Sequence, residues 1–114
     1  MEHVIDAQGK RIGRIATKVA TILMGKHTAV FARNIVSPDT VKIINVSKAD
    51  ISEKKMKGHI TSTHSHYRGG QRNRTREQIV DAKGYAETFR IAIAGMLPKN
   101  KLKTERLKHL TISE

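Results

Sequence analysis

The sequence contains no cysteine and no tryptophan, and only four other aromatic residues among its 114 positions. Without cysteine the chain can form neither a disulfide scaffold nor a thiolate metal site, and a reducing compartment is allowed. Its apolar runs are only a few residues long, so no segment is predicted to span a bilayer. The opening residues match neither a secretory signal nor an arginine-rich transit peptide, which favours a cytoplasmic protein.

Acidic residues are also few relative to basic ones. The chain has 22 Lys and Arg against 10 Asp and Glu, a formal net charge of +12. A compact fold with this charge repels itself unless something acidic covers it, and the candidates are nucleic acid, an anionic membrane or an acidic protein. Nucleic acid is favoured because the charge lies in separated clusters and not in one tail.

The scarcity of aromatic rings indicates how nucleic acid would be bound. Modules that bind single strands stack bases on aromatic platforms. Phe31, Tyr67, Tyr85 and Phe89 are too scattered to make such a platform. Recognition of folded or duplex RNA by its shape and phosphates fits better. The length suits one unit, so residues 1–114 are predicted to form a single RNA-binding domain.

Hydrophobic periodicity predicts an α/β fold. Apolar residues at three- and four-residue steps indicate a helix over 10–24, and β-branched residues indicate a strand over 41–46. That strand is nearly continuous in hydrophobicity, as a strand covered on both faces would be. The other expected elements are strands at 3–6, 49–52 and 109–112, an exposed arm or loop at 53–76, and helices at 76–83, 85–96 and 102–110. This alternation suggests an α/β sandwich around a small, mainly parallel sheet.

The first charge cluster follows Gly9, which allows a tight turn where the first helix begins. Free N–H groups at a helix N-terminus favour anions, and Lys10, Arg11 and Arg14 would surround a phosphate there. A glycine turn with solvated basic side chains explains the same residues equally well. A nucleotide-binding P-loop is excluded, since the spaced glycine and the following Ser or Thr are absent.

The second cluster runs from His64 to Arg74 and combines donors, a tyrosine and two adjacent glycines. Glycine allows close approach of the backbone to RNA, and arginine can fork onto phosphates. The alternative is a disordered basic loop that RNA would order. A metal site at His59, His64 and His66 is not expected, since no cysteine or nearby carboxylate completes it.

Two other functions have less support. A free regulatory DNA- or RNA-binding module would need a helix-turn-helix, zinc finger or heptad zipper, and none is present. A small phosphate-handling enzyme at the Gly9 turn would need a nucleophile paired with a base, and no such arrangement has a recognisable spacing. No catalytic residue and no cofactor are therefore predicted.

Five blocks of the sequence stand out, at 4–17 with 24–27, 41–48, 64–70, 94–102 and 106–110. Together they resemble the bacterial form of the large-subunit ribosomal protein L-thirteen family. They occur in the family's order and cover nearly the whole chain, with the block at 94–102 being the most specific. The sequence resembles a short form without the usual N- and C-terminal extensions. His3 stands where the family commonly has an aromatic residue, and His66 and Arg68 replace a Gly and a Pro.

The resemblance implies a three-layer α/β/α sandwich with a small, mainly parallel four-stranded sheet. It implies a structural constituent of the large ribosomal subunit that binds and stabilises folded ribosomal RNA early in assembly, beside neighbouring ribosomal proteins. It implies a ribosome-bound, cytoplasmic protein with no enzyme activity, cofactor, metal, membrane contact or small-molecule substrate. Family contacts with RNA correspond here to residues 64–74 and 95–103.

The charge clusters and the resemblance together give one set of predicted RNA-binding residues: Lys10, Arg11, Arg14, Lys26, His27, Lys55, Lys57, His64, Ser65, His66, Tyr67, Arg68, Gly69, Gly70, Arg72, Arg74, Arg76, Lys99, Lys101 and Lys103.

Overall fold

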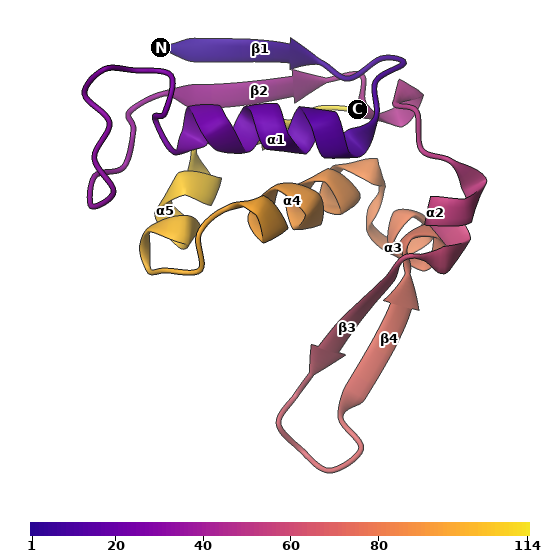
Figure 1. The fold of residues 1–114 in the computed structure, drawn as a ribbon. Coiled ribbons are helices and arrows are strands. Elements are labelled where there is room, and N and C mark those ends of the chain that lie inside the picture. The colour runs from indigo at the N-terminus through magenta and orange to yellow at the C-terminus, as the bar shows by residue number, and fades with distance from the viewer.

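A computed structural model describes all residues, 1–114, and its main sheet has three parallel strands (Figure 1). The strands are β1 (Glu2–Asp6), β2 (Thr40–Ile44) and β5 (Leu110–Ile112), in the order β1-β2-β5. Ile43 of β2 lies opposite Ile5 on one side and Ile112 on the other. The central strand therefore depends on partners from both ends of the chain.

The two faces of this sheet differ in burial. Val41 and Ile43 are almost fully buried, whereas Lys42 between them is exposed. Val4 and Thr111, the neighbours of Lys42 in register, are exposed as well. Because successive side chains of a strand point to opposite faces, one face meets the core and the other is open. The expectation that this strand is covered on both faces is wrong.

Two long helices supply most of the core beside the buried face. They are α1 (Ile12–Leu23) and α4 (Tyr85–Met96), which pack against each other. The apolar positions of α1 recur on one face and are buried, and Phe89 and Ile93 of α4 are fully buried one turn apart. Burying each such side chain stabilises the fold by roughly 1.5–3 kcal/mol. No helix combines the length and the apolar character needed to cross a membrane.

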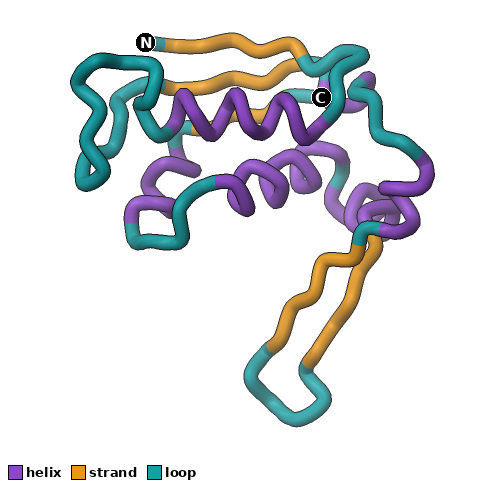
Figure 2. The backbone as a smooth tube through the Cα atoms, viewed as in Figure 1, coloured by secondary structure: helices purple, strands orange, loops and turns teal.

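A hairpin arm projects from the rest of the molecule (Figures 1 and 2). Its strands are β3 (Ile60–His64) and β4 (Gln71–Thr75), which pair antiparallel. The short helix α2 (Glu53–Gly58) enters the arm, and α3 (Arg76–Lys83) leaves it. Thr75 and Gln78 form a reciprocal capping box at the start of α3, which determines where the arm ends.

Two short helices complete the fold. A 3₁₀ turn, η1 (Val46–Lys48), follows β2, and α5 (Leu102–Lys108) precedes β5. Between α1 and β2 the chain runs from residue 24 to residue 39 without a helix or strand. This is a long connection for a compact domain.

The α/β class, the mainly parallel sheet and its packing against helices confirm the expected fold class. Two details differ. The parallel sheet has three strands, not four, and the other two strands form the separate hairpin. No helix covers the open face, so a third layer is absent. The weak strand expected at 49–52 reduces to one bridge between Arg11 and Asp50, and α2 follows because Glu and Lys favour helix.

Candidate nucleic-acid interface

The hairpin arm carries Arg72 and Arg74 on one face. Arg72 lies opposite Thr63 and Arg74 opposite Thr61, so these four side chains share one side of the ribbon. They line a groove of about 400 Å³ between the arm and the helices α3 and α4, which add Lys83 and Glu87. Three cations against one carboxylate make this groove suitable for an anion. On the other face, the Ser62 hydroxyl donates to Asn73 Oδ1 at 2.7 Å.

The tip of the arm is a compact turn. The backbone N–H of His66 donates to His64 Nδ1 at 2.8 Å, and the N–H of Gly70 donates to the Tyr67 carbonyl at 3.0 Å. A Cβ on Gly70 would lie 2.1 Å from Ser65 Oγ and 3.0 Å from the Tyr67 carbonyl oxygen, so a larger residue there would require Ser65 to move. The turn leaves Tyr67, Arg68 and Gly69 exposed, with the Tyr67 side chain free to contact a partner.

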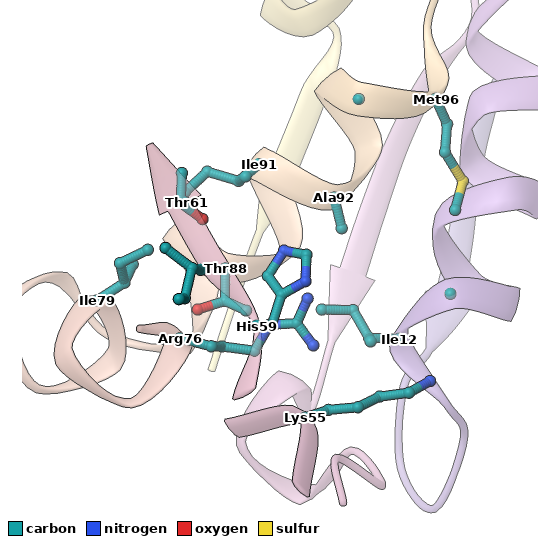
Figure 3. Close-up of a pocket in the computed structure, with 13 residues that line it drawn as sticks. Ile12, Lys55, His59, Thr61, Arg76, Ile79, Thr88, Ile91, Ala92 and Met96 are labelled. Carbon is teal, nitrogen blue, oxygen red and sulfur yellow. The ribbon is translucent and has the colours of Figure 1, made fainter. Parts of the chain in front are cut away.

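A basic pocket lies at the base of the arm, where Arg76 and His59 lie side by side between α1 and α4 (Figure 3). Its volume is about 510 Å³, and no carboxylate lines it. Arg76 is buried without an ion pair, and this burial lowers the pKa of its guanidinium. Burial first, then the charges of Arg76 and Lys55, lowers the pKa of His59. The pocket is therefore electropositive and apolar-walled.

Only some of the RNA-binding residues predicted for this part of the chain line the pocket. Lys55 lines it and Lys57, on the same helix, is exposed. Arg76 was expected as a surface contact but is only 9% exposed, so a ligand reaches it only through the pocket. The buried Thr88 hydroxyl, which also lines the pocket, has no hydrogen-bond partner.

The turn at Gly9 forms as expected, with φ +64° and the first helix beginning at Ile12. Lys10, Arg11 and Arg14 surround a hollow of about 530 Å³. Asp50 also lines this hollow, and its Oδ2 lies 3.5 Å from Arg11 Nε. Part of the charge predicted to face a phosphate is thus already paired within the protein.

The carboxylate of Asp6 anchors the same turn. Its Oδ1 accepts a hydrogen bond from Asn45 Nδ2 at 3.0 Å and one from the N–H of Gln8 at 3.1 Å. These bonds favour the ionised form, so they lower the pKa of Asp6, the Asn45 bond most. Asn45 itself has φ +58°, a left-handed conformation that asparagine tolerates. The turn is therefore held by polar contacts from two strands.

The remaining predicted residues lie at the other end of the molecule from the arm. Lys26 and His27 belong to the connection between α1 and β2, and His27 Nε2 lies 3.0 Å from Asp39 Oδ2. Lys99 and Lys101 lie between α4 and α5 and are exposed, and Lys103 lies in the first turn of α5 and is half-buried. The structure does not gather the predicted set into one site. It places the residues on the arm, at its base, at the Gly9 turn and at this far end (Figure 1).

Two basic residues differ from what their place in the sequence indicates. Arg106 follows the predicted contacts Lys99, Lys101 and Lys103 in the sequence, yet it is 2% exposed, and its Nη2 donates to the Ile35 carbonyl at 3.4 Å. Lys83 belongs to no predicted cluster, yet it lines the groove beside Arg72 and Arg74. No local pattern signals either placement, because both depend on how distant elements pack.

The whole chain matches a known protein family. The family model described as Ribosomal protein L13 matches residues 1–114. The chain belongs to the ribosomal protein L13 family. The resemblance seen in the sequence is thereby confirmed, and so is the expectation that the chain is not an enzyme, since the L13 family consists of structural ribosomal proteins.

Relatives match the chain along nearly its full length. The large ribosomal subunit protein uL13 of Symbiobacterium thermophilum is 39% identical over 110 residues, which are 96% of this chain and 76% of the relative. The uL13 protein of Clostridioides difficile is 36% identical over the same shares. That of Aliarcobacter butzleri is 41% identical over 96% of this chain and 78% of its own length.

Proposed function

We propose that this L13-family chain is a structural constituent of the large ribosomal subunit, in which it binds and stabilises folded ribosomal RNA from an early stage of assembly. Residues 1–114 act as one RNA-binding unit. The observation that carries the proposal is the exposed arm, whose paired arginines line an open cationic groove. The names of the relatives, large ribosomal subunit protein uL13, support the same assignment.

The arm suits an RNA backbone. Exposed arginines two residues apart in a strand lie on one side, where their planar guanidinium groups can each grip a phosphate through two hydrogen bonds. The arm is thin and projects from the core, so it can enter a space between RNA helices (Figure 2). The tip adds one exposed ring, Tyr67, for a single base or sugar. This is recognition of shape and phosphate, not of base sequence.

Contacts at the Gly9 turn and at the lysines after Pro98 would hold the chain at two places outside the arm. A unit with a net charge of +12 and few acidic residues repels itself, and a polyanion that contacts it on more than one side reduces this repulsion. Neighbouring ribosomal proteins are the other expected partners, and the open sheet face offers one surface for them.

The deciding experiment replaces Arg72 and Arg74 together by alanine. We expect affinity for protein-free large-subunit ribosomal RNA to fall by roughly tenfold per arginine, the size of one charge-assisted hydrogen bond. The free energy of unfolding should change by less than about 0.5 kcal/mol per site, since both side chains are exposed. Filter binding and chemical denaturation measure the two quantities.

The matched control replaces Arg90 and Lys108 by alanine. Both are exposed and outside the predicted interface, and the change in net charge is the same. An equal loss of affinity in the control would mean that only total charge matters. A large loss of stability in the arm variant would show that Arg72 and Arg74 belong to the fold.

A further inference from the structure

Three potential metal ligands from separate segments meet at the end of the sheet far from the arm. They are His3 of β1, His27 of the connection after α1, and Asp39 just before β2. One ligand atom of each lies within 4.8 Å of those of the other two. The rings of His3 and His27 meet edge to face, with centroids 5.2 Å apart. The fold, not a local motif, creates this cluster.

We propose that His3, His27 and Asp39 form a binding site for a divalent transition metal of the zinc type. Two imidazole nitrogens and one carboxylate are a ligand set that Zn²⁺ takes, with a fourth position left for water. Bonds of about 2.0–2.1 Å in a tetrahedron put ligand atoms roughly 3.3 Å apart. The three side chains therefore need only a small closure. Hard cations such as Mg²⁺ prefer oxygen ligands and fit poorly.

The state of His3 is the first support for a bound metal. Its Nε2 is buried and has no hydrogen-bond partner in the protein. A buried polar atom without a partner is costly, and most such atoms in folded proteins find one. A metal ion at the cluster would supply the missing partner to this nitrogen.

The surroundings of Asp39 are the second support. Its carboxylate is 8% exposed, accepts a hydrogen bond from the Ser37 hydroxyl at 2.8 Å, and lies 3.1 Å from the amino group of Met1. These groups hold the carboxylate in place, as the outer contacts of metal-binding carboxylates do.

A simple ion pair is the competing explanation. His27 Nε2 lies 3.0 Å from Asp39 Oδ2, which a protonated imidazole would satisfy without any metal. That pair leaves the buried nitrogen of His3 unexplained. The net charge of +12 and the nearby amino group oppose a cation, so we expect an affinity in the micromolar range and not the much tighter binding of thiolate sites.

A metal here would act as a clamp. The connection over residues 24–39 lacks regular structure, and it exposes the apolar side chains Val30 and Ile35. A bound ion would tie the start of this connection, at His27, to its end at Asp39 and to the edge strand β1. The site is structural in this proposal, with no reaction assigned to it, and it is independent of the proposed RNA contacts of the arm.

The experiment uses the full chain without an affinity tag and without RNA. Co²⁺ is titrated first, because tetrahedral nitrogen and oxygen ligation gives visible absorption bands that water-bound Co²⁺ lacks. Zn²⁺ should displace it at one equivalent. At a hundredfold excess over its dissociation constant, Zn²⁺ should raise the Tm by on the order of 10 °C. Mg²⁺ at the same concentration should leave the Tm unchanged.

Variants locate the site. His3→Gln and Asp39→Asn should each weaken Co²⁺ binding at least tenfold. The control, His64→Gln with His66→Gln, removes the other close histidine pair, whose rings lie 5.7 Å apart on the exposed arm, and should bind as the original chain does. Loss of binding in this control, with retention in the His3 variant, would overturn the proposal.

A measurement on the unaltered chain covers the case in which a variant fails to fold. Addition of Zn²⁺ should shift the imidazole NMR signals of His3 and His27 together, with smaller changes at His59 and His109. Shifts confined to His64 and His66, or none at one equivalent, would sink the metal site.

Discussion

Burial separates arginines that carry the same charge and lie in basic stretches of the sequence. Arg76 and Arg106 are buried without a carboxylate partner, whereas Arg72 and Arg74 are exposed. A charge taken out of water loses several kcal/mol of solvation unless hydrogen bonds replace it. For Arg106, the hydrogen bond to the Ile35 carbonyl replaces part of the lost solvation. For Arg76, the open pocket does so. The first therefore serves the fold, and the second remains available to a ligand.

The bond from Asn45 to Asp6 gives a prediction about a single pKa. Replacing Asn45 by glycine keeps the left-handed backbone and removes the amide, so the pKa of Asp6 should rise toward its ordinary value of 3.8. An NMR titration of the Asp6 carboxyl measures this directly. An unchanged pKa would mean that the Gln8 N–H, and not Asn45, governs the carboxylate.

The same bond predicts the direction of a pH effect. Because folding lowers the pKa of Asp6, its contribution to stability is present above about pH 3.8 and is lost as the pH falls through the lowered, folded-state pKa. Asn45→Gly should therefore make the free energy of unfolding less dependent on pH in that acid range. At neutral pH the variant retains the Gln8 bond to the same oxygen.

At the scale of single residues, the sequence predicts local backbone turns well, but it predicts poorly which side chains are buried and which distant residues they contact. The Gly9 turn follows from a local rule and is found as expected. The cluster of His3, His27 and Asp39 is invisible in the sequence, since its members are up to 36 positions apart and meet only when the sheet forms. The burial of Arg76 and Arg106 is hidden for the same reason.

Among the elements, α3 depends on a cap at its junction with the arm. Thr75 Oγ1 accepts a hydrogen bond from the N–H of Gln78, and Gln78 Oε1 accepts one from the N–H of Thr75. Thr75→Ala should lower the free energy of unfolding by about 1 kcal/mol, within a range of about 0.5–2. Chemical denaturation measures the loss.

Thr75→Ser is the matched control, because serine keeps the hydroxyl and caps helices at least as well. It should remain within a few tenths of a kcal/mol of the original. Equal destabilisation by serine and alanine would assign the effect to the threonine methyl group and not to the cap.

The elements with a strong period are those that the sequence predicts best. The helices at 76–83 and 85–96 and the closing strand are confirmed with bounds close to those expected. The segment over 53–76 has no apolar pattern, so its division into α2 and a hairpin could not be anticipated. Its strands are held by pairing with each other and by the tight turn at Gly70, not by a buried face.

For the whole molecule, the phosphate model predicts a steep response to salt. If about six to eight phosphates are contacted, affinity for ribosomal RNA should fall between about 10³- and 10⁵-fold from about 50 to 200 mM salt, by the rule for duplex DNA. Filter binding across a salt series gives the slope. A flat response would contradict binding through phosphates.

The ribosomal assignment predicts where the native protein is found. In sedimentation of a cell extract at moderate salt, the chain should travel with the large subunit and with its early precursors. Particles isolated during assembly, analysed for their protein content, test the early stage separately. Recovery of the chain in the soluble fraction alone would contradict the assignment to the ribosome.

The order of strands in the sheet has a consequence for how the protein is made. The central strand β2 pairs with β1, which is synthesised before it, and with β5, which is synthesised some 65 residues later. While the chain is growing, Val41 and Ile43 therefore lack one neighbouring strand until residues 110–112 emerge. Interior apolar surface and an unpaired strand edge invite wrong association. The nascent chain is therefore most prone to wrong association just before β5 is translated. A message truncated before the codons of β5 would release a protein in which β2 lacks one of its two neighbouring strands.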